Sequence, residues 1–71
     1  MIDFCLVGGG FIGPLHAANI ARHPNARLRW IVDVNTAAAE ALAGKFGGQP
    51  TANLDDALAD PAVRAVMICT P

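Results

Sequence analysis

Three stretches of the chain consist mostly of apolar residues, at 2–7, 28–32 and 65–69. A strand with one face in water alternates apolar and polar residues, whereas a strand of a parallel sheet covered on both faces reads as a nearly continuous apolar run. The three stretches therefore predict strands of a parallel sheet. Ile2 to Val7 is the first and central strand, Leu28 to Val32 the second, and Ala65 to Cys69 the last.

A helix is predicted between the first two strands. It begins near Gly13 and ends at about Arg22 or His23, because Pro24 disfavours helical geometry in the residue before it and cannot continue the hydrogen-bond ladder. Small residues recur along it at intervals of four, and we expect this row to let the helix lie close to the sheet. The row consists of Gly13, Ala17 and Ala21.

A second helix is predicted over residues 37–46. Asn35 or Thr36 can cap its start, and Gly47 offers a left-handed stop at its end. Residues at intervals of four form its expected apolar face. These are Ala38, Leu42 and Phe46.

The segment before the last strand is less regular. Gln49 to Ala52 predicts a short third strand, and Pro50 places it at the sheet edge. Asn53 is expected to cap a brief helix over residues 54–59, followed by a turn at Asp60-Pro61. Strands and helices thus alternate, and right-handed crossovers give an α/β, Rossmann-type parallel sheet with strand order 3-2-1-4, the first part of a doubly wound domain.

The hexapeptide Gly8-Gly9-Gly10-Phe11-Ile12-Gly13 follows the first strand directly and fits G-x-G-x-x-G. Gly8 would allow a tight turn, Gly10 would let the backbone approach a pyrophosphate, and the N–H groups near Phe11 and Ile12 would point at phosphate oxygens. Gly13 would serve helix packing. A glycine-rich hexapeptide by itself is equally compatible with a flexible turn that binds nothing.

An acid at the end of the second strand supports the dinucleotide interpretation. Asp33 follows Gly13 by 20 positions, where the dinucleotide fingerprint has a carboxylate for the adenosine ribose. That carboxylate would repel a 2′-phosphate, and neither Val34 nor Asn35 supplies a cation, so NAD is expected as the cofactor and NADP is disfavoured. The strand order puts the ligand crevice between Gly8 to Gly13 on one side and Thr70-Pro71 on the other.

Composition narrows the function classes. The 71 residues are 54% hydrophobic and 15% charged, with a formal net charge of −1, and a doubly wound domain needs about twice that length. We expect residues 1–71 to be the N-terminal part of a dinucleotide-binding domain, without its remainder or a substrate domain. No basic patch suggests nucleic acid, and no membrane span or signal peptide is expected, so a cytoplasmic location is the default.

Several residues that suggest chemistry have simpler explanations. We expect His16 and His23 to be structural, Trp30 to belong to the core, Lys45 to lie in solvent at a helix C-terminus, and Asp55 and Asp56 to favour a helix start. Cys5 and Cys69 lie within apolar runs and are expected to be buried thiols, with no metal site. The last strand is apolar and unpaired on one side, so the 71 residues alone are expected to be marginally stable or to self-associate.

The sequence resembles the glucose–fructose oxidoreductase/inositol dehydrogenase (Gfo/Idh/MocA) family, most of all the inositol 2-dehydrogenases. The resemblance spans essentially the whole chain, and its most specific parts are 54–63 and 65–71, a strand ending in Thr70-Pro71. It implies hydride transfer from a cyclitol, sugar or related polyol to a nicotinamide cofactor, in an enzyme that is a homo-oligomer at full length. Gly8, Gly10, Phe11, Ile12 and Gly13 would then form the pyrophosphate loop. Asp33 and Val34 would contact the adenosine half, and Thr70 and Pro71 would line the crevice toward the nicotinamide.

The family's catalytic positions have no counterparts in this chain. Its proton-transfer lysine belongs to a Glu-Lys-Pro motif on the next strand, and its further acid and histidine belong to a substrate domain. No catalytic residue is therefore assigned. Two alternatives to a dehydrogenase stay open, a dinucleotide-binding sensor module without turnover and an inactive fragment.

Overall fold

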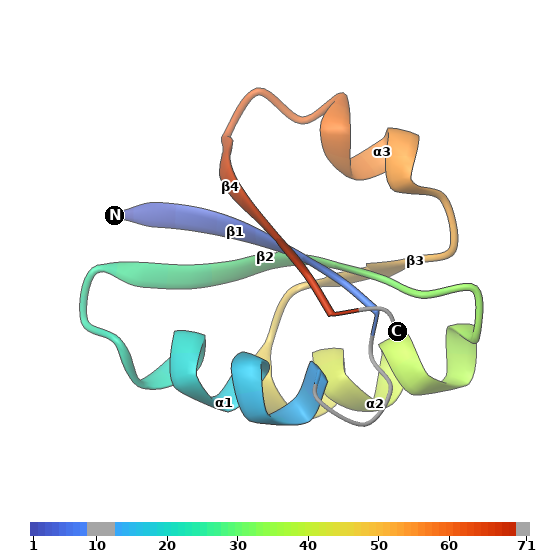
Figure 1. The fold of residues 1–71 in the computed structure, drawn as a ribbon, viewed down its shortest axis with the longest axis horizontal. Coiled ribbons are helices and arrows are strands. Elements are labelled where there is room, and N and C mark those ends of the chain that lie inside the picture. Colours follow the sequence, from blue (N-terminus) through green and yellow to red (C-terminus); the bar gives the residue numbers. More distant parts are fainter. Residues whose placement is uncertain (9–12, 70–71) are drawn as a thin grey trace.

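The fold was obtained as a computed structural model, which describes residues 1–8 and 13–69. Strands and helices alternate along the chain, and the strands form one parallel sheet with the order β3-β2-β1-β4 (Figure 1). This confirms the Rossmann-type topology predicted from the sequence, with β1 central and β3 at an edge. The elements are β1 (Ile2–Val7), α1 (Gly13–Arg22), β2 (Ala26–Val32), α2 (Thr36–Phe46), β3 (Gln49–Thr51), α3 (Leu54–Leu58) and β4 (Val63–Ile68).

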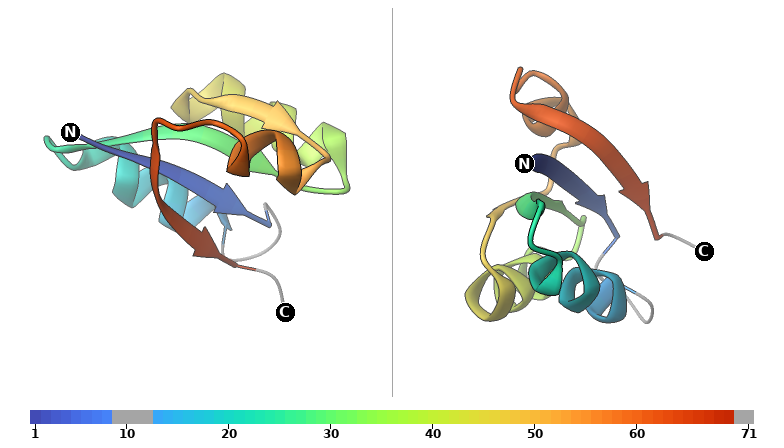
Figure 2. Two further views of the ribbon diagram at one scale, coloured as in Figure 1. Left: turned by 90° about the horizontal axis from the view of Figure 1, so that it is seen from above. Right: turned by 90° about the vertical axis from the view of Figure 1, so that its left-hand side faces the viewer.

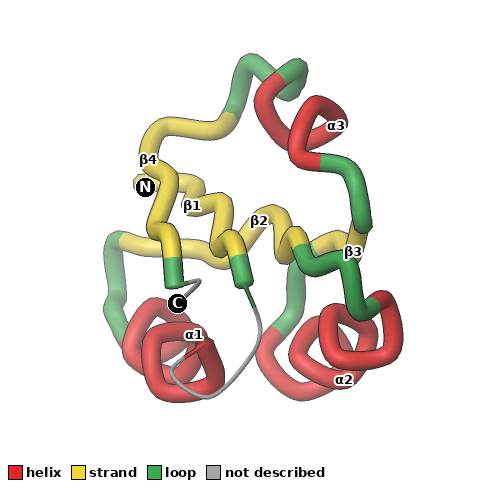
Figure 3. Tube along the Cα trace, turned by 45° about the vertical axis from the view of Figure 1, so that its right-hand side comes forward, coloured by secondary structure: helices red, strands yellow, loops and turns green. Residues whose placement is uncertain are grey.

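The helices cover the two faces of the sheet unequally. Helices α1 and α2 lie side by side on one face, and α3 lies on the opposite face (Figure 2). Helix α3 contacts β2 and β3, and its Ala57 also packs in an apolar cluster with Cys5 of β1, whereas most of β4 lies away from this helix (Figure 3). Val66 and Ile68 on β4 are accordingly 43% and 71% exposed.

Two apolar clusters hold the layers together. The larger one lies between the sheet and the pair α1 and α2, and the smaller one lies under α3. Burial of apolar surface is the main favourable term in folding, so the larger cluster contributes most of the stability. Its buried members are Leu6, Ala17, Ile20, Leu28, Ile31, Ala39 and Leu42. The smaller cluster consists of Cys5, Val32 and Ala57.

The faces of the two long helices differ from the expected ones. On α1 the buried residues are Ala17 and Ile20, whereas Ala21 is exposed. On α2, Ala39 and Leu42 are buried, whereas Ala38 is only half-buried. Ala17, Leu42 and Phe46 lie in or against the larger cluster as expected. The expected rows were wrong for Ala21 and Ala38, because strict intervals of four drift away from a period of 3.6 residues and the buried stripe alternates intervals of three and four.

The ends of α2 follow the residues expected to define them. The Asn35 side chain caps the start by accepting a hydrogen bond from the Ala38 N–H at 3.2 Å. At the other end Gly47 donates its N–H to Ala43 O. Gly47 has φ 86° and ψ 178°, so its φ is positive as expected while its ψ is extended, and the expected left-handed helical stop is wrong in this respect.

Two glycines near the end of α2 predict opposite effects of the same substitution. Gly44 lies within the helix with open space where a Cβ would be, so Gly44→Ala is expected to raise the free energy of unfolding by about 0.5 to 1 kcal/mol. Gly48 has φ +101°, and a Cβ there would lie 3.1 Å from Leu28 O. Gly48→Ala should therefore lower the free energy of unfolding by more than about 1 kcal/mol. Urea titration of both variants measures the difference, and equal effects would contradict the positive φ of Gly48 in the turn after α2.

The strand boundaries shift slightly from prediction. β2 begins at Ala26, two residues earlier than expected, and β4 covers Val63–Ile68 instead of 65–69. Cys69 still donates its N–H to Val7 O at 2.7 Å, so the residue after β4 continues the pairing with β1. Within the described part of the chain, β4 pairs with β1 alone.

Candidate dinucleotide-binding cleft

A cleft of about 240 Å³ lies at the carboxyl ends of three neighbouring strands. In Figure 1 this is the end toward which β1 and β2 run before the chain turns into α1 and α2. Ligands of open parallel sheets bind outside the carboxyl ends of the strands. The residues that line the cleft are Val7, Gly8, Val32, Asp33, Val34, Ala52 and Leu54.

The end of β1 is fixed on both sides. Gly8 donates its N–H to Val32 O on β2 at 2.7 Å, and Val7 O accepts from the Cys69 N–H. Gly8 has φ 92°, a conformation that side chains with a Cβ rarely adopt. The backbone conformation at position 8 therefore requires glycine.

Hydrogen bonds within the described part of the chain help to place Asp33. Its backbone N–H donates to Thr51 O at 3.0 Å, which joins the end of β2 to the end of β3. Its carboxylate Oδ1 accepts from the Asn35 N–H, also at 3.0 Å. The half-buried carboxylate thus has a defined orientation at the cleft, in the position where a ribose diol could donate to it.

The rest of the lining is apolar. Val34 is 91% exposed and Leu54 38% exposed, so both apolar side chains are accessible to a ligand in the cleft. None of the described residues that line the cleft is a cation, so a 2′-phosphate beside Asp33 would find no countercharge among them. The sequence analysis missed Ala52 and Leu54, because only the parallel pairing of β3 with β2 brings them beside Asp33.

The structure brings together part of the predicted site. Gly8, Asp33 and Val34 meet at the cleft, and Gly13 is the first residue of α1. Five predicted residues lie outside the described part of the chain. They are Gly10, Phe11, Ile12, Thr70 and Pro71.

The other residues considered for chemistry lie elsewhere. His16 is half-buried on α1, and His23 Nδ1 accepts a hydrogen bond from the Asn25 N–H at 3.1 Å. Lys45 is exposed, with its Nζ 5.5 Å from the Phe46 ring centroid. Over residues 1–8 and 13–69, no group of three or more His, Cys, Asp or Glu side chains is arranged to hold a metal ion.

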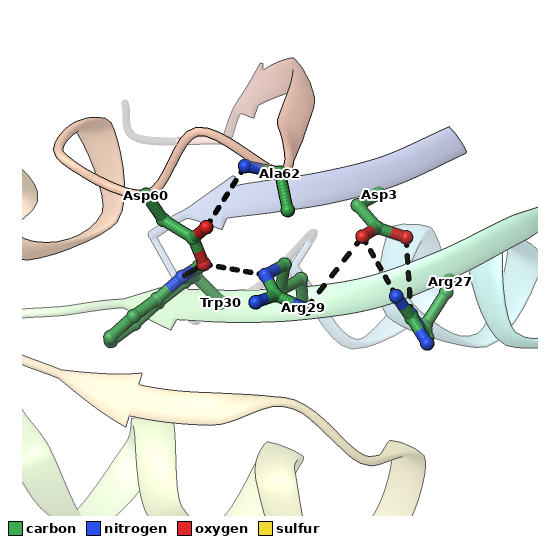
Figure 4. Close-up of polar contacts among 6 residues, drawn as sticks. All are labelled: Asp3, Arg27, Arg29, Trp30, Asp60 and Ala62. Carbon is green, nitrogen blue, oxygen red and sulfur yellow. Dashed lines mark hydrogen bonds and ion pairs between the residues drawn. The ribbon is translucent and has the colours of Figure 1, made fainter. Parts of the chain in front are cut away.

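A second cavity, of about 360 Å³, lies toward the amino ends of β2 and β3. It is bordered by a polar cluster that crosses from the sheet to the loop before β4 (Figure 4). Asp60 accepts hydrogen bonds from Arg29 Nε, from Trp30 Nε1 at 2.8 Å and from the Ala62 N–H at 2.9 Å. Beside it, Arg27 forms a two-point contact with Asp3 at 2.8 and 3.1 Å. Because each carboxylate already faces a guanidinium, this cluster is a structural clamp.

A β-bulge explains how adjacent residues reach the same acid. Phe4 on β1 is paired with Leu28, but the next residue, Cys5, is paired with Trp30, so Arg29 is an extra residue on β2. A bulge interrupts the alternation of side chains between the two faces. Arg29 and Trp30 can therefore both donate to the same oxygen, Asp60 Oδ2, on the face that carries α3.

The clamp predicts a pH dependence of stability. Hydrogen bonds from Arg29, Trp30 and Ala62 lower the pKa of Asp60 to about 2 from its usual value of 3.8. A carboxyl whose pKa is lowered by folding stabilises the protein above its unfolded-state pKa, and this contribution is lost as the pH falls from about 4 to about 2. The urea midpoint of the wild type should fall as the pH is lowered through this window. Asp60→Asn should have a lower urea midpoint at pH 7, and its midpoint should depend less on pH. Glu40 is an exposed acid on α2, so Glu40→Gln should show the same pH dependence of the urea midpoint as the wild type. The same pH dependence in Asp60→Asn would contradict the role of the clamp.

None of the helices within residues 13–69 is long and apolar enough to cross a membrane.

Comparison with known proteins gives closely similar chains. The chain is 42% identical over 71 residues to the inositol 2-dehydrogenase of Rhizobium meliloti (strain 1021), covering 99% of this chain and 21% of that protein. The chain thus spans about a fifth of the length of the relative it matches.

Two solved structures share the fold closely. GenD2 from gentamicin A biosynthesis, in complex with NAD, superposes with a TM-score of 0.95 at 43% identity, over 99% of this chain and 20% of GenD2. A myo-inositol dehydrogenase from Corynebacterium glutamicum superposes with a TM-score of 0.93 at 34% identity, over 100% of this chain and 21% of that enzyme. Residues 2–71 match the family model described as an oxidoreductase family with an NAD-binding Rossmann fold. The chain therefore belongs to the Gfo/Idh/MocA family of NAD-binding oxidoreductases.

Proposed function

We propose that residues 1–71 form the N-terminal part of the dinucleotide-binding domain of an NAD-dependent dehydrogenase that acts on inositol or a related cyclic polyol. The observation that carries the proposal is the cleft at the carboxyl ends of β1, β2 and β3, with Asp33 at its edge and Gly8 at the turn beside it. The dehydrogenases of inositol that share the fold support the substrate class.

The described residues fit the adenosine half of NAD. The Asp33 carboxylate would accept hydrogen bonds from the ribose hydroxyls, and the apolar side chains of Val34 and Leu54 would exclude water from the adenine. Gly8, Gly10, Phe11, Ile12 and Gly13 would carry the pyrophosphate, and Thr70 and Pro71 would face the nicotinamide half. When NAD is bound, its nicotinamide ring supplies the hydride acceptor for the carbon that carries the reacting hydroxyl.

The lining also supports a preference for NAD over NADP. A 2′-phosphate would lie beside the Asp33 carboxylate, and the two negative charges would repel each other. No cation among the lining residues offsets this repulsion. We further propose that the full-length enzyme is a cytoplasmic homo-oligomer. Its proton-transfer residue would lie outside the described residues.

The proposal is tested by titrating NAD and NADP into the protein at its full natural length, followed by turnover assays. Saturable NAD binding that is tighter than NADP binding, with NADH formation from myo-inositol or scyllo-inositol, is the expected result. NAD binding without turnover of any cyclic polyol would favour a dinucleotide sensor. A folded protein that binds neither dinucleotide would overturn the proposal.

A further inference from the structure

Thr51, the last residue of β3, forms hydrogen bonds in three directions at the cleft. Its carbonyl accepts from the Asp33 N–H at 3.0 Å. Its hydroxyl accepts from the Asn53 N–H at 3.1 Å and donates to Asp56 Oδ2 at 2.9 Å. One residue thus connects the end of β2, the loop after β3 and the first turn of α3.

The residues that Thr51 connects are those that line one side of the cleft. Asp33 lies beside Thr51 in space, and Ala52 and Leu54 follow Thr51 in the chain. The Asn53 side chain fixes the same loop by accepting from the Asp55 N–H at 3.0 Å. We define Ala52 and Leu54 as the α3 wall of the cleft.

We propose that Thr51 is a positioning residue for the adenosine half of the cofactor, because it holds the α3 wall at a set distance from the Asp33 carboxylate. This inference rests on the proposed function. Without the hydroxyl, the loop from Ala52 to Leu54 would keep its covalent links and the Asn53 cap but lose both bonds that tie it to β3 and to Asp56. The wall would then sample more orientations, and binding would have to order it.

Because the hydroxyl bonds of Thr51 are local, their effect on ligand binding can be measured separately from their effect on global stability. Both hydroxyl bonds join residues within five positions of each other at an exposed loop, where hydrogen bonds contribute little to global stability. Thr51→Val keeps the β-branched shape and the backbone carbonyl that holds Asp33, and it removes only the hydroxyl. Thr51→Ser keeps the hydroxyl and removes a methyl group.

The experiment titrates ADP-ribose, which lacks the nicotinamide, into wild type and both variants at full natural length, with urea midpoints of the unliganded proteins. Thr51→Val should bind ADP-ribose about fivefold more weakly, on the order of the cost of immobilising one loop side chain on binding. Thr51→Ser should bind within about twofold of wild type, because the hydroxyl bonds re-form. The urea midpoints of all three proteins should be nearly equal.

A second pair of variants tests the wall itself. Leu54→Ala should weaken ADP-ribose binding, whereas Leu58→Ala, on the same helix and 55% exposed outside the cleft lining, should not. Wild-type affinity in Thr51→Val, or equally weak binding in Thr51→Ser, would overturn the positioning role. Failure of the wild type to bind NAD and ADP-ribose would instead overturn the proposed function.

Discussion

Substitution of Leu6 by alanine is expected to lower the free energy of unfolding by about 3 kcal/mol, within the range of about 2 to 5 kcal/mol for a buried leucine. Leu6 lies in the central strand with 0% of its surface exposed, inside the larger apolar cluster. A folded domain has a total stability of roughly 5 to 15 kcal/mol. The substitution should therefore raise the unfolded fraction on the order of 100-fold.

Leu15→Ala provides the matched control, because Leu15 is on α1 with 62% of its surface exposed. The same atoms are deleted, but few contacts are lost, so its urea midpoint should stay close to wild type. Circular dichroism during urea titration measures both variants. Similar midpoints for Leu6→Ala and Leu15→Ala would show that β1 is not the centre of the core.

Substitution of Asp33 by asparagine is expected to reduce the preference for NAD over NADP by about 30-fold, since hydrogen bonds to a charged group are worth about 1.5 to 3 kcal/mol. The amide keeps the shape and an oxygen that can accept from the Asn35 N–H. It removes the negative charge that strengthens hydrogen bonds from the ribose and repels a 2′-phosphate. Calorimetric titration of both dinucleotides measures the ratio.

Glu40→Gln removes the same charge from an exposed position on α2 outside the cleft lining and should leave the NAD-to-NADP ratio unchanged. An equal change in both variants would assign the effect to net charge. A ratio unaffected by Asp33→Asn would place the ribose somewhere other than at the end of β2.

Strong local signals made most of the architecture predictable. Pro24 and Asn35 define helix ends through backbone chemistry that acts within a few residues, and α1 ends at Arg22 and α2 starts after Asn35 as expected. The apolar runs around Leu6 and Ile31 identified β1 and β2 because both faces of these strands are covered. The handedness of the crossovers then left one strand order to expect.

Features that depend on register were not predictable. The bulge at Arg29 changes which face a side chain occupies, and no local pattern in residues 26–32 marks it. Asp60 was expected only in a turn, whereas it closes the clamp with Arg29 and Trp30 across some thirty positions of sequence. Polar residues this far apart in the chain become neighbours only once the sheet has been assembled.

The candidate site divides along the same line. Gly8 and Asp33 were identified because each terminates a strand and the fingerprint fixes their spacing. Ala52, Leu54 and Thr51 carry no recognisable spacing, and they reach the cleft through the pairing of the three-residue strand β3 with β2. A short edge strand of this kind can bring residues to a cleft without any periodic pattern in the sequence.

The central position of β1 has a consequence for the order of folding. One edge of β1 pairs with β2, which follows after a single helix, whereas its other edge pairs with β4, which follows only after α3. During synthesis from the N-terminus, β1, α1 and β2 emerge together and can associate as a local unit. The second edge of β1 stays open until residues 63–68 leave the ribosome. Nascent chains are therefore most exposed to mispairing in the interval before β4 arrives.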